Sequence, residues 1–418
     1  MRIALISFEY PPETAFGGIA TYTAQQAELL CQAEHDVEVF AASRRSDSEL
    51  GPTGLRLNRV PVSDLGHREE FTQALGAVFR KRHLHRPFDV VEFPEHGAHG
   101  LEIVRDFPHL PRVVRLHTPG YLCEELGWEP LPTSLRWRRW LGALKQGQWP
   151  RPSQPPTPNH AEDAERQLTL AADEIVAPCQ DLADRAGHDW QLPREQLRVI
   201  PNSFTAPDLL LQIPLDTDTR RISFIGRLER RKGIHDLVTA IPLVLRARPD
   251  VRFRLIGANA LAPDRRSDMH SWIRRHLGRW QEAVELTGAV PPARVHELLA
   301  ETDICVFPSH WENFPYVCLE SMAAGRGIVA SDCGGFAELL ADPTAGLLVR
   351  PRSPQQLAQA IVLMIESPRM RISLARSARE RVLRLSGTHL APLMEASYHR
   401  AIARRLERLT LQDVPLDA

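Results

Sequence analysis

Long apolar runs, clustered cysteines and an excess of charge are all missing from this chain of 418 residues. No apolar run approaches the about 20 residues that a membrane-spanning helix needs. The six cysteines are scattered without a CxxC pair, which is typical of reduced thiols in a cytoplasmic protein and not of a disulfide framework or zinc site. The formal net charge of −1 argues against binding to nucleic acid. These absences predict a cytoplasmic globular protein.

The first residues, MRIALISFEYPPE, combine one arginine with a short apolar run, followed by acids and prolines. This pattern indicates a first strand and not a signal peptide. A hydrophobic content of 43% with 25% charged residues is typical of a soluble protein that buries large cores. The length favours two or three domains.

Short apolar segments alternate with helix-period segments through both halves of the chain. We expect strands in the first half at residues 2–8, 37–41, 89–93, 112–117, 174–177 and 198–201, and in the second half at 222–225, 252–256, 284–287, 304–307, 327–330 and 346–349. The helices expected around them include 19–31, 69–82, 234–247, 294–301, 354–365, 371–385 and 390–409. This alternation predicts an α/β fold with two doubly wound, Rossmann-like parallel sheets.

A polar stretch rich in Asp and Thr, residues 207–220, separates the two halves. We predict an N-terminal domain over residues 1–210, a C-terminal domain over 211–385, and a helical segment over 386–418 that packs back on the first domain. Ligands of open parallel sheets bind beyond the carboxyl ends of the strands. Two such domains that face each other therefore predict a binding cleft between them.

Residues 119–163 separate two strands of the first domain by more than an ordinary loop, which indicates a functional insertion. Prolines at 150, 152, 155, 156 and 158 argue against regular structure there. The segment 135–145 is basic and carries Trp and Leu at near-helical spacing. Three interpretations stay open for it: a helix packed on its domain, a lid over an anionic or lipid-linked acceptor, and a peripheral contact with an anionic membrane surface, such as the inner membrane face.

Two turns that follow predicted strands carry groups suited to phosphate. Gly17 and Gly18 precede the first helix, where paired glycines let the backbone approach an anion closely. Arg227 and Lys232 flank the turn GRLERRKG after the strand at 222–225, and two cations at this spacing can straddle a diphosphate. A tight turn and a solvated basic loop are the ordinary structural alternatives.

Two glutamates with seven residues between them, Glu312 and Glu320, lie in SHWENFPYVCLESMAAG. Glu312 follows the strand at 304–307, and Glu320 lies in the opening turns of a helix that Pro315 is suited to begin. A carboxylate beside a helix N-terminus is placed to accept hydrogen bonds from hydroxyl groups. His117, at the end of the strand 112–117, is placed to bind a sugar hydroxyl or to act as an acid or base.

Taken in order, GRLERRKG, the Glu-x7-Glu segment ending LESMAAG, and ASDCGGFAEL resemble the retaining GT-B glycosyltransferases of family 4, with FGGI and the strand ending at His117 in support. The resemblance covers most of the chain. It departs at Ser203-Phe204-Thr205, where the family commonly has Gly-Val-Asp, and at Gly327, which replaces a frequent proline.

The resemblance implies a GT-B fold and transfer of a sugar from a UDP- or GDP-sugar donor, without metal or another cofactor. The residues expected to contact the donor are Gly17, Gly18, Arg227, Lys232, Gly257, Val290, Glu312, Asn313, Phe314, Pro315 and Glu320. Those expected on the acceptor side are Tyr10, Phe16, His96 and Tyr121, and the expected catalytic residues are His117, Arg227, Lys232 and Glu312. We expect retention of the anomeric configuration with the leaving diphosphate as base, because no carboxylate of the first domain stands out as a nucleophile.

The acceptor stays open among a sugar, a lipid-linked molecule and a small molecule, in the synthesis of a cell-surface glycan, a glycolipid or a secondary-metabolite glycoside. The alternatives to a transferase are a sugar-nucleotide epimerase or a phosphorylase of the same fold, and a non-catalytic sugar-nucleotide-binding protein. A DxD motif, Asp216-Thr217-Asp218, lies in the linker and not at a strand end, so it does not predict a metal site.

Overall fold

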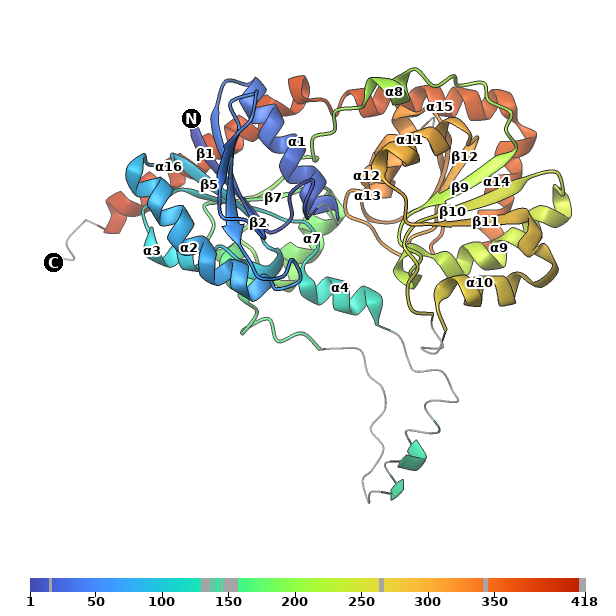
Figure 1. Cartoon of the computed structure of the whole chain (residues 1–418), viewed down its shortest axis with the longest axis horizontal. Coiled ribbons are helices and arrows are strands. Elements are labelled where there is room, and N and C mark those ends of the chain that lie inside the picture. The colour runs from blue at the N-terminus through green and yellow to red at the C-terminus, as the bar shows by residue number, and fades with distance from the viewer. Residues whose placement is uncertain are drawn as a thin grey trace.

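The computed structural model of the chain describes residues 1–14, 17–128, 137, 140–142, 144–145, 157–262, 267–340 and 345–412. Within these residues the chain forms two sheets, each covered by helices, and the two lobes lie side by side (Figure 1). The predicted α/β fold of two doubly wound domains is confirmed. The domain limits at 1–210, 211–385 and 386–418 stay predictions.

The first sheet has eight strands among the described residues, in the order β3-β4-β2-β1-β5-β6-β7-β8. In chain order the strands are β1 (Arg2–Ser7), β2 (Asp36–Ser43), β3 (Ser48–Leu50), β4 (Arg56–Pro61), β5 (Val90–Pro94), β6 (Arg112–Arg115), β7 (Glu174–Ala177) and β8 (Leu197–Val199). All neighbours pair in parallel except β3 with β4. The sequence patterns missed β3 and β4, and β6 ends before the predicted end at residue 117.

The second sheet has six parallel strands among the described residues, in the order β11-β10-β9-β12-β13-β14. They are β9 (Arg221–Ile225), β10 (Arg252–Ile256), β11 (Val284–Gly288), β12 (Ile304–Phe307), β13 (Gly327–Ser331) and β14 (Leu347–Val349). In both sheets the first strand in sequence lies inside the sheet, so the strand order reverses beside it and opens a crevice at the carboxyl edge.

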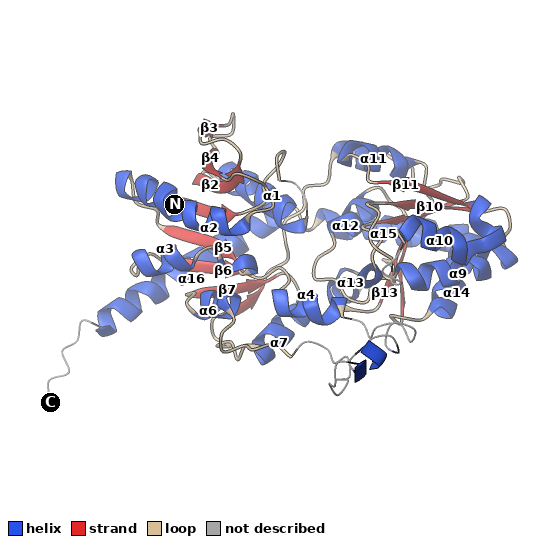
Figure 2. Ribbon diagram, turned by 60° about the horizontal axis from the view of Figure 1, so that its bottom comes forward, coloured by secondary structure: helices blue, strands red, loops and turns tan. Residues whose placement is uncertain are grey.

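The helices of the first domain are α1 (Gly18–Gln32), α2 (Arg68–His85), α3 (Leu101–Asp106), α4 (Gly120–Gly127), α6 (Ala164–Leu170) and α7 (Gln180–Asp189). Those that follow are α8 (Asp208–Leu211), α9 (Ile234–Ala247), α10 (Met269–Leu277), α11 (Pro292–Ala300), α12 (Tyr316–Ala323), α13 (Gly334–Leu339), α14 (Pro354–Glu366), α15 (Pro368–Leu383) and α16 (Gly387–Gln412). Figure 2 shows α7 and α13 where the two lobes meet, and these two helices are in contact.

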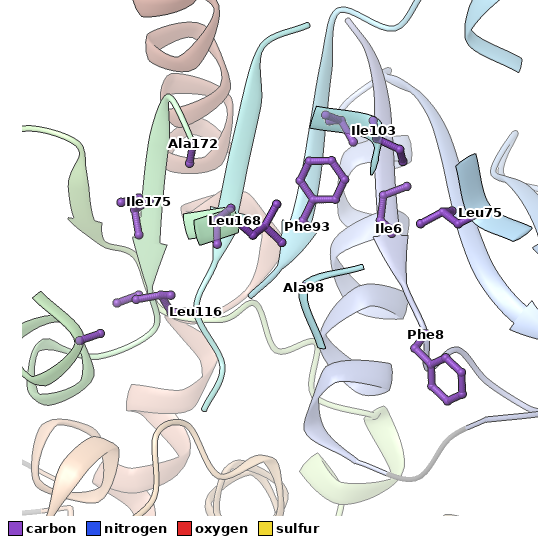
Figure 3. Packing of buried hydrophobic residues seen from close by; sticks show 14 of the residues in the cluster. Ile6, Phe8, Leu75, Phe93, Ala98, Ile103, Leu116, Leu168, Ala172 and Ile175 are labelled. Atoms are coloured by element: carbon purple, nitrogen blue, oxygen red, sulfur yellow. The ribbon is translucent and has the colours of Figure 1, made fainter. Parts of the chain in front are cut away.

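The inner strands, such as β1, β5 and β12, are buried on both faces, which explains why they read as continuous apolar runs. In β1, Ile3 and Leu5 pack on one face of the sheet, whereas Ile6 belongs to the cluster on the other face. Figure 3 shows Ile6 near Phe93 of β5 within that second cluster. Because side chains alternate along a strand, both faces need a helical cover.

Helix α16 returns to the first domain and packs against β5, β6, β7 and α1. Its apolar residues Met394 and Tyr398 join the core over β1 and β2. Its arginines pair with two fully buried acids at the amino end of β7: Arg400 with Glu174 at 2.7 Å and Arg405 with Asp173 at 2.9 Å. The last helix is therefore part of the first domain's structure, although the second domain precedes it in sequence.

No helix among the described residues is both long and apolar enough to cross a membrane. About half of the predicted insertion lies outside the described residues, including the prolines at 150, 152, 155 and 156, whereas Pro158 is described. Within the segment 135–145, Trp137, Trp140, Leu141 and Leu144 are described and exposed.

Candidate active site

The loop after β9 carries the predicted cationic turn and lies against the loop after β12. Gly233 adopts φ +70°, and a Cβ there would lie 1.8 Å from the carbonyl oxygen of Pro308. The backbone N–H of His310 also donates to the carbonyl of Arg231 at 2.8 Å. Only glycine permits this close approach, which brings the end of the cationic turn to the glutamate segment.

Lys232 and Arg231 converge on the carboxylate of Glu312. The Lys232 ammonium donates a hydrogen bond to Glu312 Oε1, and Arg231 Nη1 lies 3.8 Å from the same oxygen. The Glu312 side chain is 8% exposed. Burial alone would raise the pKa of Glu312, but the charges of Lys232 and Arg231 outweigh it and lower that pKa. The structure therefore joins two of the predicted catalytic residues and adds Arg231, which the sequence patterns did not single out.

Arg227 lies at the same rim but extends outward. Its guanidinium is 63% exposed and lies 3.3 Å from Glu229. Its charge reaches across to the first domain, where it lowers the pKa of Glu9 against the larger, opposite effect of burial. Arg227 thus lies largely in solvent at the rim that faces the first domain.

Glu320, in α12, has a 23% exposed side chain and lies 4.0 Å from His296 Nε2. Burial raises the pKa of Glu320 to about 7. The carboxyl group therefore titrates near neutral pH, unlike Glu312. Pro315 immediately precedes α12 and does not occupy its first helical position as predicted.

Other residues predicted to contact the donor hold the loops together. Gly257 approaches the turn after β9, where a Cβ would lie 1.8 Å from the carbonyl oxygen of Gly226. Val290 and Phe314 pack against the core of the second domain. The amide of Asn313 donates to the carbonyl of His117, so its side chain links the two domains.

His117 follows β6 and is buried beneath the first domain's edge. Its backbone N–H donates to both oxygens of Glu95 at 2.9 and 2.8 Å, and its ring packs edge-on against Tyr22. Burial, aided by the charge of Arg115, lowers the pKa of His117 to about 3. The ring is therefore neutral at physiological pH, which suits a hydrogen-bonding partner better than a general acid.

Gly17 and Gly18 stand at the start of α1, as predicted, and Gly17 faces a carboxylate. A Cβ on Gly17 would lie 3.3 Å from Glu9 Oε2. The other Glu9 oxygen accepts a hydrogen bond from Arg68 at 3.2 Å, whereas the buried Oε2 has no partner among the described atoms. Glu9 was not predicted as a site residue, although its position directly after the first strand could have indicated it.

Two further acids of the first domain, Glu95 and Glu165, accept hydrogen bonds from backbone N–H groups of nearby loops. Glu165, at the start of α6, accepts hydrogen bonds from the N–H groups of Gly97 at 2.8 Å and Gly120 at 2.6 Å. It also lies 3.4 Å from His96 Nδ1. Burial and the neighbouring charge of Glu165 raise the pKa of Glu95 to about 8. The sequence around Glu165 does not predict that it binds two glycine N–H groups, because these partners lie in distant loops.

The predicted acceptor residues are not gathered in one place. His96 lies beside Glu165 and close enough to affect the pKa of His117. Tyr10 packs with the core residues on the other face of the sheet, and the hydroxyl of Tyr121 donates to Asp189 at 2.8 Å. Phe16 lies outside the described residues.

The DxD motif lies at the opposite end of the second domain. Asp216 and Asp218 line a pocket of about 320 Å³ together with Arg221 and Ile304, which begin β9 and β12. This is the amino edge of the sheet, whereas Lys232 and Glu312 lie at the carboxyl edge. No group of three or more potential metal-binding side chains occurs in the described part of the chain. Independence from metal stays a prediction.

Comparison with known proteins identifies the family of the chain and the solved structures that share its fold. Residues 16–205 match the family model "Glycosyltransferase Family 4" and residues 219–367 match "Glycosyl transferases group 1". The chain is 24% identical to D-inositol 3-phosphate glycosyltransferase of Pseudarthrobacter chlorophenolicus, over 98% of this chain and 97% of that protein.

Two solved structures share the fold over nearly the whole chain. Sucrose-phosphate synthase from Thermosynechococcus elongatus gives a TM-score of 0.71 at 22% identity, over 96% of this chain and 99% of that one. Anabaena Alr3699/HepE in complex with UDP-glucose gives a TM-score of 0.61 at 17% identity, over 98% of this chain and 100% of that one.

Proposed function

This chain belongs to family 4 of the GT-B glycosyltransferases, the glycosyl transferases group 1, and we propose that it moves a sugar from a UDP- or GDP-sugar to an acceptor hydroxyl with retention of configuration. The observation that carries the proposal is the convergence of Lys232 and Arg231 on Glu312 at the carboxyl edge of the second sheet. Cations and a carboxylate at one point match a donor that carries a diphosphate next to sugar hydroxyls.

Breaking the bond between sugar and diphosphate leaves an electron-poor sugar and a more negative diphosphate. Lys232 and Arg227 are the groups proposed to stabilise that growing charge, since preorganised cations act most strongly on charge that develops in the transition state. In the structure Lys232 is paired with Glu312. A bound diphosphate would take over Lys232, and Glu312 would then accept hydrogen bonds from the hydroxyls of the transferred sugar.

On the acceptor side we assign to Glu9 a hydroxyl of the acceptor that does not itself attack the sugar. Its Oε2 is buried and unpartnered among the described atoms, and it lies against the glycine turn at Gly17. A buried carboxylate oxygen without a partner is costly, so a hydroxyl donor from the acceptor would satisfy it. Glu95 and Glu165 are already occupied by backbone N–H groups.

The hydrogen bonds of Glu95 and Glu165 also support the proposal that the anomeric configuration is retained. Glu95 accepts hydrogen bonds from the backbone N–H of His117, and Glu165 accepts them from two glycine N–H groups. Neither carboxylate is therefore placed as a nucleophile towards the sugar. The leaving diphosphate is then the proposed base for the acceptor hydroxyl. No metal is needed for this step where the cations of the second domain neutralise the diphosphate.

The test is a screen of UDP- and GDP-sugars for acceptor-dependent release of nucleotide, followed by NMR of the anomeric proton of the product. We expect release that requires acceptor, persists in the presence of a chelator and gives the donor's anomeric configuration. An inverted linkage would overturn retention. Binding of sugar nucleotide without any release would favour the non-catalytic alternative, and interconversion of donor sugars without acceptor would favour an epimerase.

The exposed Trp137, Trp140, Leu141 and Leu144 support a second, independent proposal: a peripheral contact of the segment 135–145 with an anionic membrane surface. The check is co-sedimentation with vesicles that contain or lack anionic lipid. Equal sedimentation with the two vesicle types would reject an electrostatic contact.

A further inference from the structure

Trp311 belongs to the second domain by sequence but to the first domain by packing. It follows β12, whose Phe307 lies in the core of the second domain. The Trp311 side chain is nevertheless 1% exposed and joins the hydrophobic cluster whose other buried members all come from the first domain. One large aromatic side chain of the donor-binding domain is thus embedded in the opposite domain.

The polar edge of the indole is also held by the first domain. Trp311 Nε1 donates a hydrogen bond to Asp181 in the first turn of α7. Asp181 in turn pairs with Arg185 at 3.2 Å, and the Arg185 guanidinium lies 5.8 Å from the indole ring. The contact therefore combines burial, a charged hydrogen bond and a nearby cation.

A second contact from the same side completes the N-terminus of α7. Cys179, the residue before the helix, makes no side-chain capping bond. The carboxylate of Glu338, in α13 of the second domain, instead accepts hydrogen bonds from the N–H groups of Gln180 at 2.6 Å and Asp181 at 3.2 Å. A carboxylate at a helix N-terminus is favoured both by these bonds and by the helix dipole.

Glu312 and Asn313, which follow Trp311 in sequence, are held by hydrogen bonds close to these interdomain contacts. The carbonyl of Glu312 accepts a hydrogen bond from Gly335 N–H at 2.8 Å, at the start of the helix that carries Glu338. A Cβ on Gly334 would lie 2.0 Å from the same carbonyl oxygen, so the two segments fit only with glycine there. Asn313 reaches the carbonyl of His117. The catalytic carboxylate is therefore flanked on both sides by contacts to the first domain.

We infer that Trp311 and Asp181 form an interdomain anchor that positions Glu312 and Asn313 against His117. The inference rests on the proposed transferase function. Both are positioning residues, because neither lies where the sugar or diphosphate would bind. Nucleotide binding by the second domain does not require this anchor, whereas alignment of donor with acceptor does.

The test compares Trp311→Phe, Asp181→Ala and the double variant in the full chain. We expect kcat of transfer to fall about tenfold in each single variant, the scale of losing one hydrogen bond to a charged group. The double variant should fall no further than the singles, since both changes remove the same bond. Dissociation constants for UDP and GDP should stay within about twofold of wild type.

Asp184→Ala is the matched control. Asp184 lies on the same helix and accepts a hydrogen bond from Gln180 Nε2 of its own domain at 2.8 Å, so its removal should leave kcat unchanged. Unchanged kcat in both single variants, additive losses in the double variant, or a parallel loss of nucleotide affinity would each overturn the anchor.

Small-angle scattering separates this inference from the proposed function. The radius of gyration of the full chain with UDP or GDP should increase in Asp181→Ala and not in Asp184→Ala. If wild type transfers no sugar, the proposed function fails and scattering alone decides the anchor. An unchanged radius in Asp181→Ala would then reject it.

Discussion

At the carboxyl edge of the second sheet four cations lie within one short turn, whereas the titratable groups at the edge of the first sheet are mainly acids and neutral histidines from distant parts of the chain. Lys232 and Arg231 reach Glu312 because two adjacent loops touch. Glu9 and Glu165, in contrast, follow different strands or begin a helix after a long insertion. The proposed donor side thus depends on two short segments, whereas the proposed acceptor side is assembled by the fold.

This difference fits the chemistry of the two ligands. Every nucleotide-diphosphate sugar carries the same charged group, so a fixed turn of cations next to a carboxylate serves any of them. Acceptors share only a hydroxyl, and the site proposed for them contains Glu9 and Glu165, whose pKa values are raised mainly by burial. Mutations that affect donor binding and acceptor use separately test this difference between the two sheet edges.

The largest effect is expected for Lys232→Ala. Removing one preorganised charge that acts on the transition state lowers the rate by about 10²–10³-fold. Initial rates of transfer at saturating donor and acceptor measure it. Arg294→Ala is the control, because Arg294 is exposed and pairs only with Glu297 of its own helix among the described residues. A loss in Lys232→Ala no larger than in this control would contradict the proposed role of the turn.

A smaller effect, confined to the acceptor, is expected for Glu9→Gln. The amide keeps the shape but replaces a carboxylate oxygen, so the acceptor KM should rise about tenfold, as for a hydrogen bond to a charged group. The dissociation constant of the donor should not change. Glu13→Gln serves as control, since Glu13 lies in the same loop and is held by Arg59 at 2.9 Å. Equal behaviour of the two variants would remove Glu9 from the acceptor site.

Donor affinity should depend on pH through Glu320. Burial raises its pKa to about 7, so the carboxyl group is mostly protonated at pH 6 and mostly ionised at pH 8. The ionised form accepts stronger hydrogen bonds from ribose hydroxyls. We expect the affinity for the sugar nucleotide to increase a few-fold over this range, measured by calorimetry without acceptor.

The variant Glu320→Gln should bind the donor with little change over the same range. The pKa of Glu312 is lowered instead, so its carboxylate stays ionised at both pH values and does not contribute to the slope. A pH dependence that survives in Glu320→Gln would assign the titration to another group.

The smallest effect concerns stability, through Glu95. Its pKa is raised from 4.5 to about 8 in the folded protein, so the folded state binds more protons than the unfolded state between these values. The stability contributed by this group is complete below pH 4.5 and is lost as the pH rises towards 8. The amide in Glu95→Gln does not titrate, so the melting temperature of wild type should fall by a few degrees relative to the variant between pH 6 and 9. Parallel melting curves would show that Glu95 is ionised throughout.

Much of the secondary structure could be predicted from periodicity. The strands expected at 174–177, 252–256 and 304–307 and the helix at 234–247 coincide with β7, β10, β12 and α9. The patterns failed at β3 and β4, where polar residues form an edge hairpin. They also extended β6 to His117, because an apolar run does not reveal that the His117 N–H turns towards Glu95.

The site was predictable to the extent that its chemistry lies in short segments. Lys232 and Glu312 were both expected from the sequence, and the structure brings them into contact. Tyr10 and Tyr121 looked equally suitable, yet their side chains are used in packing and in a bond to Asp189. A side chain near a strand end can point to either face, and local sequence does not decide which.

Sequence alone determined the alternation of strands and helices, the family, and the cation and glutamate segments of the second domain, because these depend on side-chain periodicity and on groups a few residues apart. Only the tertiary structure placed Trp311 in the core of the other domain, left Glu9 with an unpartnered oxygen and set Glu165 on two distant backbone turns. Those features depend on desolvation and on contacts between chain segments far apart in sequence. Burial and distance are properties of the folded chain, and no short stretch of residues contains them.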